Sequence, residues 1–309
     1  MTTLDLTETL RTIKDRQWML SDIDWDAPGA ELIRDDQRAN LKAFMADLMW
    51  IEHVGARAFA GLALHAPTEE LKEIYRYFHA EEQKHANAEL ALMKRWGLLE
   101  EGEIPLPGVM ICHSLDTMDK IADTAPFEYQ ATVIPMLEVA LDGALLKFLT
   151  DEVQDPLLKV VLNKINRDES RHLAVGFHVM GMLSGARIRR TLLVLFKLAY
   201  SMRVVSLRHV IATLPIIGSM REELYAMGMD GSRLSAAMDR YRKAGERDPR
   251  LEKNHYYRIV RGYSKLVMER HPVWSRVEGA MIAYAKRIPV QKWPERPSWS
   301  SELTYETAV

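Results

Sequence analysis

The chain has 309 residues, a formal net charge of -2 and one cysteine, and 48% of its residues are hydrophobic. Acidic and basic residues are mixed along the sequence, so no basic stripe is present that would bind a nucleic-acid backbone. The single cysteine, Cys112, excludes an intrachain disulfide and a cysteine-built zinc or iron–sulfur site. These features predict a globular protein of a reducing cytoplasm with no nucleic-acid partner.

The two stretches that could direct the chain to a membrane lack the required pattern. The N-terminus carries acidic residues where a signal peptide needs a basic start and an apolar run, so no export signal is expected. The most hydrophobic stretch, residues 191–215, is interrupted by Lys197, Arg203, Arg208 and His209. So many charges exclude a membrane span and predict a packed amphipathic helix.

The pattern of apolar residues predicts an all-α fold, because these residues recur at helical spacing and turn residues are widely spaced. A first long helix is expected over residues 36–65. Thr68 is followed by Glu69 and Glu70, an arrangement that caps a second helix, which is expected to stop near Gly97. These two helices would form a first antiparallel hairpin.

A second hairpin is predicted after a loose crossover that is rich in glycine and proline and has room for a short helix. The third helix is expected over residues 127–153, with a kink at Pro135. The fourth is expected to begin at the Asp155-Pro156 turn and to end near Gly185. The two hairpins together predict a four-helix bundle.

The remaining sequence predicts about four further helices and then a tail rich in Pro and Trp that starts at Ile288. The expected breaks between these helices are at Gly218, Gly231, Pro249 and Pro272. We therefore divide the chain into an N-terminal segment (1–35), the bundle (36–185) and C-terminal helices (186–309) that pack on the bundle within one domain.

Glu-x-x-His motifs carry the chemical signal in this sequence. On a helix, this spacing places a carboxylate and an imidazole one turn apart on one face, where both can bind one metal ion. With ten histidines in the chain, chance would supply roughly one such pair. The sequence contains three, namely Glu82/His85, Glu169/His172 and Glu252/His255.

The first two motifs each have a partner glutamate on the preceding helix. Glu52 lies 30 residues before Glu82, and Glu138 lies 31 residues before Glu169, so that the midpoints fall at the two predicted turns. Residues equidistant from the turn of an antiparallel hairpin lie at the same height. Because buried carboxylates need a compensating cation, the two hairpins predict a dinuclear metal site. Its six ligands would be Glu52, Glu82, His85, Glu138, Glu169 and His172.

The segments AEEQKH and RDESRH, each with its upstream glutamate, resemble the motifs of the ferritin-like di-iron carboxylate oxidoreductases over residues 36–185. This superfamily includes ribonucleotide reductase small subunits, p-aminobenzoate N-oxygenase, acyl carrier protein desaturases and ligand-binding oxidases with a manganese/iron centre. The resemblance implies that two iron ions, or manganese and iron, are bound by the six ligands. It also implies that the acid before each motif bonds the histidine of the opposite hairpin, Asp168 to His85 and Glu81 to His172.

Two departures separate the chain from particular members of the superfamily. The extra histidine of the N-oxygenase corresponds to Ile165, and the radical tyrosine of ribonucleotide reductase corresponds to Glu89. A tyrosyl-radical generator is therefore disfavoured. His79 is a candidate extra ligand, although a role beside the ligands or at the surface is favoured. Asp142, one turn after Glu138, is a candidate proton relay and equally an ordinary buried ion-pair partner.

Several other residues have a functional and a plainer interpretation. Small residues near the ligands either open a cavity or allow close helix packing, and packing is favoured. They are Gly55, Ala56, Ala60 and Gly143. The third motif, Glu252/His255, has no upstream partner and follows Pro249, so a solvent-facing helix start is the favoured interpretation.

The ligand set and the resemblance predict an oxidoreductase whose di-metal centre activates dioxygen to oxidise a small, organic and apolar substrate. The chain lacks a dinucleotide fingerprint, so electrons are expected from a separate reductase or ferredoxin. Two alternatives are an iron-storage or peroxide-scavenging protein and a metal-free helical interaction protein. The residues beyond the bundle are expected to cover the site or to form a homodimer interface. The substrate and the reaction type are left open.

Overall fold

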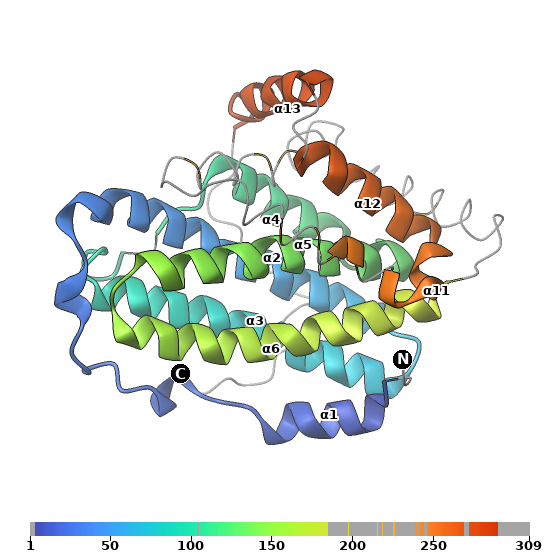
Figure 1. Cartoon of the computed structure of the whole chain (residues 1–309), viewed down its shortest axis with the longest axis horizontal. Coiled ribbons are helices and arrows are strands. Elements are labelled where there is room, and N and C mark those ends of the chain that lie inside the picture. Colours follow the sequence, from blue (N-terminus) through green and yellow to red (C-terminus); the bar gives the residue numbers. More distant parts are fainter. Residues whose placement is uncertain are drawn as a thin grey trace.

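The computed structural model describes residues 4–103, 105–184, 246–268 and 272–289, together with isolated positions between 197 and 243. Within this part of the chain the elements are helices, and no strand is present. The predicted all-α fold is confirmed. Figure 1 shows the long helices α2, α3, α5 and α6 side by side, with α12 along one flank.

The first hairpin consists of α2 (Arg38–His65) and α3 (Glu69–Arg95), close to the predicted bounds. The Thr68 side chain accepts a hydrogen bond from the Leu71 backbone nitrogen at 3.2 Å, which satisfies one of the free N–H groups of the first turn. Gly97 has a φ of 62°, a left-handed conformation that ends the helix at low cost because glycine has no Cβ.

The second hairpin consists of α5 (Phe127–Glu152) and α6 (Pro156–Met182), and the short helix α4 (Val109–Ile121) lies in the crossover before it. Asp155 caps α6 by accepting a hydrogen bond from the Leu157 backbone nitrogen at 2.9 Å. The same carboxylate accepts hydrogen bonds from Arg95 and Trp96, each at 2.8 Å. One buried carboxylate therefore starts α6 and ties it to the end of α3.

Packing of the two hairpins creates two apolar layers with a polar layer between them. Helix α2 packs on α3 and on α5, and α6 packs on α5 and on α3. One apolar cluster includes Leu48, Leu92 and Ile165, and a second includes Ile74 and Val179. On α3, α5 and α6 the predicted ligands lie between these clusters, and on α2 Glu52 lies at the end of the first cluster. A hydrophobic core therefore holds them in place from both sides.

The N-terminal segment, for which the sequence predicts no particular element, contains helices. It contains α1 (Leu6–Asp15) and three short 3₁₀ turns, η1 (Leu20–Asp22), η2 (Ala30–Leu32) and η3 (Asp35–Gln37). Helix α1 lies against α3, and its Ile13 side chain is fully buried in the second apolar cluster. The segment is therefore docked on the bundle (Figure 1).

The described C-terminal helices are α11 (Pro249–Glu252), α12 (His255–Met268) and α13 (Pro272–Ala285). Pro249 and Pro272 each open a helix at its first position, where a missing backbone N–H costs nothing.

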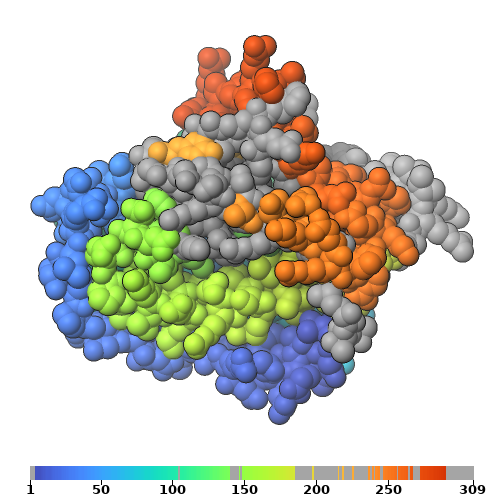
Figure 2. All heavy atoms as spheres, in the orientation of Figure 1, coloured from blue at the N-terminus to red at the C-terminus, as the bar shows by residue number. Residues whose placement is uncertain are grey.

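These helices also cover part of the bundle. Helix α11 contacts α6 and α12 contacts α5, and Figure 2 shows this orange segment lying over the yellow-green α6. Whether these helices belong to one domain with the bundle stays a prediction.

Other predictions for the C-terminal part fall mostly outside the described residues. Gly218 itself is helical, whereas Gly231 and the tail from residue 290 lie outside the described part, as does most of the stretch 191–215. Among the helices that the structure describes, none is both long and apolar enough to cross a membrane.

Candidate metal centre

The six predicted ligands come together in the polar layer as two overlapping groups. The His85 group consists of Glu52, Glu82, His85 and Glu169. The His172 group consists of Glu82, Glu138, Glu169 and His172. Within each group one ligand atom per residue lies within 4.8 Å of all the others, and all six side chains are buried. The shared residues, Glu82 and Glu169, come one from each hairpin.

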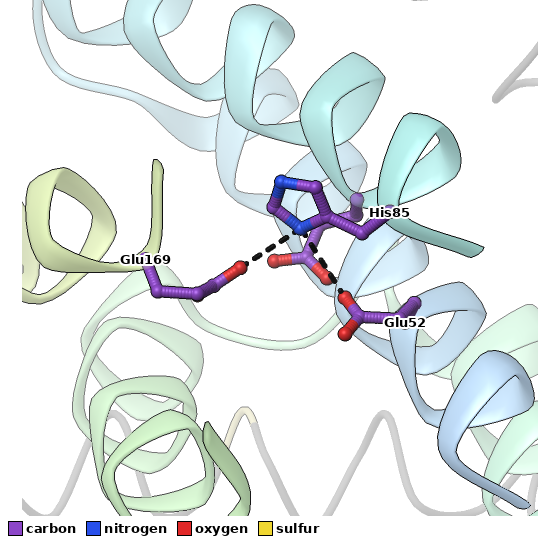
Figure 3. Close-up of side chains that lie close together, drawn as sticks. Glu52, His85 and Glu169 are labelled. Atoms are coloured by element: carbon purple, nitrogen blue, oxygen red, sulfur yellow. Dashed lines mark ion pairs between the residues drawn. The ribbon is translucent and has the colours of Figure 1, made fainter. Parts of the chain in front are cut away.

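Both histidines face the shared carboxylates through Nδ1. His85 Nδ1 lies 2.9 Å from Glu169 Oε1 and 3.5 Å from Glu52 Oε2, as Figure 3 shows. His172 Nδ1 lies 3.1 Å from Glu169 Oε2 and 3.2 Å from Glu82 Oε1. Each imidazole therefore meets a carboxylate of its own hairpin and one of the opposite hairpin. The two contacts across the hairpins, His85 with Glu169 and His172 with Glu82, mirror one another.

The far side of each imidazole is held by an acid from the opposite hairpin. Asp168 Oδ2 lies 3.0 Å from His85 Nε2, and Glu81 Oε2 lies 2.9 Å from His172 Nε2. These are the two pairings that the resemblance implies. A carboxylate that accepts the Nε2 proton leaves the Nδ1 lone pair directed at the centre, which is the tautomer that binds a metal ion.

The donor set fits two divalent cations. Within the described residues, both carboxylate oxygens of Glu138 are buried and have no hydrogen-bond partner. Four carboxylates in an apolar core are strongly unfavourable without compensating charge, and two divalent ions would neutralise them. Oxygen and nitrogen donors of this kind suit iron or manganese.

The pKa values of the ligands follow from burial and from mutual repulsion. Burial raises the pKa of Glu138 to about 8. Burial and the neighbouring Glu169 charge raise the pKa of Glu82 well above its usual value. Burial opposes charge on His172, but the Glu169 carboxylate outweighs it and raises the histidine pKa to about 10. Without metal, Glu82, Glu138 and His172 bind protons more tightly than usual, and metal ions would have to displace those protons.

The outer acids are fixed by residues that the sequence argument missed. Gln17 Nε2 donates to Glu81 Oε1 at 2.6 Å, and Trp18 Nε1 donates to Asp168 Oδ2 at 2.7 Å. These adjacent residues follow α1, so the docked N-terminal segment contacts both acids at once. Arg171 also donates to both, at 2.9 Å to Glu81 and at a shorter distance to Asp168. Nothing in the local sequence pattern identifies Gln17 and Trp18, because they lie more than 60 residues from the acids they bind. Arg171 follows Asp168 by three residues, a helical spacing that could have indicated their contact.

Glu89 is a further buried carboxyl near the centre. Its side chain is fully buried and neither carboxyl oxygen has a hydrogen-bond partner among the described residues. Burial and then the charge of Glu52 raise its pKa well above the usual value. From the sequence, Glu89 is notable only because it occupies the position of the radical tyrosine of ribonucleotide reductase.

The other candidates lie outside the two ligand groups. His79 is buried, and its Nδ1 hydrogen-bonds to the Ala56 carbonyl of the α2 backbone at 2.7 Å. Asp142 belongs to α5, but its side chain lies outside the described part, as does that of Gly143. Glu252 and His255 lie on different helices, and Glu252 forms an ion pair with Arg261, in agreement with the plainer interpretation.

A cavity of about 80 Å³ adjoins the ligands on the side of α2 and α5. Three ligand carboxylates, those of Glu52, Glu82 and Glu138, form part of its wall. The rest of the wall is largely apolar and includes Val133 and Leu137. The cavity therefore offers a largely apolar space directly beside the centre.

Gly55 of α2 lies directly against the carboxylate of the predicted ligand Glu82. A Cβ on Gly55 would lie 2.6 Å from Glu82 Oε2 and 2.9 Å from Glu82 Cδ. We expect Gly55→Ala to push the Glu82 carboxylate aside and to weaken metal binding at least about tenfold, while the fold tolerates the shift of a flexible side chain.

The measurement is a competitive metal titration with a chelator. Gly262→Ala is the matched control, because a Cβ at Gly262 would meet no atom within 4 Å. Unchanged metal affinity in Gly55→Ala would contradict the placement of Glu82 among the ligands.

Comparisons of the chain with protein-family models, with curated proteins and with solved structures found no match. The buried carboxylate and histidine groups are therefore the main indication of function in this chain.

Proposed function

We propose that this protein is a ferritin-like di-iron, or manganese/iron, oxidase or oxygenase that uses dioxygen to oxidise a small apolar molecule. The observation that carries the proposal is the apolar cavity whose wall includes three carboxylates of the ligand groups. A storage protein needs a route for hydrated iron, whereas an apolar cavity at the ligands suits dioxygen and an organic substrate.

The chemistry that the metals would supply is the reduction of dioxygen. For a hydroxylation, one oxygen atom enters a C–H bond of the substrate and the other leaves as water. This reaction consumes two electrons and two protons. We assign the electrons to an external donor protein such as a ferredoxin or a flavin reductase, and the protons to the solvent. The chain's own residues hold the ions, keep the site dry and fix the histidine tautomers.

The apolar layers above and below the centre support this function. Phe59 and Phe78 pack on the His172 ring, with centroid distances of 5.1 and 4.1 Å. Trp18 stacks on His85 at 6.4 Å. These rings exclude water from the imidazoles, and in a dry site the electrostatic interactions between ligands and metal ions are stronger.

An iron titration distinguishes the proposal from iron storage. Apoprotein is mixed with increasing amounts of ferrous iron in air, and both bound iron and consumed dioxygen are measured. We expect uptake to stop at two iron ions per chain and dioxygen to be consumed further only with a reductant. Continued deposition of ferric iron beyond two ions would indicate storage. The absence of any dioxygen consumption by the loaded protein would refute the oxidase.

A further inference from the structure

We propose that Glu89 is a seventh protein ligand of the centre, and that its carboxylate coordinates the metal ion of the His85 group alone. This inference depends on the metal centre of the proposed function, but not on the reaction with dioxygen. Three observations carry it. Glu89 lies on the ligand face of α3, its carboxyl is buried without a partner among the described residues, and the charged groups that act on it belong to the His85 group.

The position of Glu89 on α3 directs its side chain toward the ligands. Glu89 follows His85 by one helical turn and Glu82 by two. Seven residues bring a helix to within about 20° of a whole number of turns, so Glu89 lies between Glu82 and His85 when α3 is viewed along its axis. Side chains on a helix lean toward its N-terminus, which for Glu89 is the direction of His85.

The surroundings of Glu89 on its own level are apolar. Its side chain is fully buried, and neither carboxyl oxygen has a hydrogen-bond partner among the described residues. Its neighbours on α3, Ala88 and Leu92, belong to the first apolar cluster. A leucine would fill this place without an electrostatic penalty, whereas an unpartnered carboxyl is unfavourable there. A metal ion one turn away would supply the partner that the described protein groups do not.

The charged groups near Glu89 assign it to one of the two metal positions. Apart from burial, the pKa of Glu89 responds to the charges of Glu52, His85 and Glu169, and all three belong to the His85 group. The two residues that belong only to the His172 group are not among the causes of its shift. Glu89 itself lies outside both groups, so its side chain must turn about its torsions to reach the ion.

The second hairpin offers no equivalent of Glu89. The two Glu-x-x-His motifs correspond residue by residue, and the residue seven positions after Glu169 is Gly176. A Cβ on Gly176 would lie 2.6 Å from Pro135 Cγ, so even an alanine would require a shift there. With Glu89, the His85 position would have five protein ligands and the His172 position four. We therefore expect the His85 position to bind its ion more tightly.

The test is a competitive titration with manganese(II) and a chelator, which measures affinity without turnover. In Glu138→Ala the remaining ion is held by the His85 group, and addition of Glu89→Gln should weaken its binding at least about tenfold. In Glu52→Ala the remaining ion is held by the His172 group, and the same substitution should leave its affinity unchanged. Glutamine keeps the size of the side chain and removes only its charge.

Two further variants separate a ligand from a packing residue. Glu89→Leu removes an unpartnered buried carboxyl, so the metal-free protein should be at least as stable, while the His85 position should lose affinity as in Glu89→Gln. Leu92→Met changes the same apolar surroundings one turn further on and should leave both affinities unchanged.

A crystal structure of the manganese-loaded wild-type protein tests the contact itself. A Glu89 oxygen should be bound to the ion beside His85. This structure decides the question if a double variant does not fold.

Equal loss of affinity in the two backgrounds, no loss in either, or a Glu89 carboxyl that contacts neither ion would overturn the inference. These outcomes are separable from the proposed function. Two bound ions that Glu89→Gln does not affect would refute only the seventh ligand. Protein in which Glu89 binds metal but which never reduces dioxygen would refute only the oxidase. Wild-type protein that binds no metal would refute both.

Discussion

Replacing Glu169 with alanine is expected to abolish binding of both metal ions. Its carboxylate belongs to both ligand groups and lies 2.9 Å from His85 Nδ1 and 3.1 Å from His172 Nδ1. Loss of an outer hydrogen-bond partner already costs about 10–100-fold in metal affinity, so loss of a shared ligand should cost more. The measurement is the metal content of the purified variant after dialysis against a weak chelator.

A second ligand variant makes this test specific to a shared carboxylate. Glu138 belongs only to the His172 group, so Glu138→Ala should retain one metal ion where Glu169→Ala retains none. Glu252→Ala changes a Glu-x-x-His motif that lies outside both groups and should keep both ions. If Glu169→Ala bound two ions as the wild type does, the shared ligand would be wrongly assigned.

Metal affinity is expected to rise steeply with pH between about 6 and 8. In the metal-free protein, burial raises the pKa of Glu138 to about 8, and the Glu169 carboxylate, acting against burial, raises that of His172 to about 10. A metal ion binds only the deprotonated ligands, so each proton displaced raises the affinity about tenfold per pH unit below the pKa. We expect at least one proton to be released per metal ion.

Calorimetry in two buffers of different ionisation enthalpy counts the released protons directly.

The same pKa values predict the opposite trend for the stability of the metal-free fold. Glu138 titrates near 4.5 when unfolded and near 8 when folded, so between these values the folded state binds more protons and its stability falls as pH rises. His172 acts in the same direction between 6.5 and 10. A metal affinity that did not change with pH would contradict buried, protonated ligands.

The sequence was sufficient to predict the bundle and the ligand layer because both depend on local spacing. A Glu-x-x-His pair lies on one face of any helix, and turn midpoints bring Glu52 level with Glu82. Thr68 and Asp155 mark the helix starts by short-range capping, and the structure has both caps. Such signals do not require knowledge of distant contacts.

The parts that could not be predicted depend on contacts between distant segments. Gln17 and Trp18 reach the outer acids only because α1 docks on α3, and that docking follows from the packing of single apolar side chains such as Ile13. The surroundings of Glu89 and His79 likewise could not be predicted, because only the structure shows that both side chains are buried. Their helical spacing resembles that of the ligands, and the difference lies in which neighbours they face.

The account is tested most directly by the metal content of the wild-type protein. The chain is expressed in medium supplemented with iron and manganese, purified without chelator, and analysed for metal and protein by mass spectrometry. The two overlapping groups predict a ratio close to two metal ions per chain, carried by iron or by iron and manganese. A ratio of one or fewer would contradict a dinuclear centre.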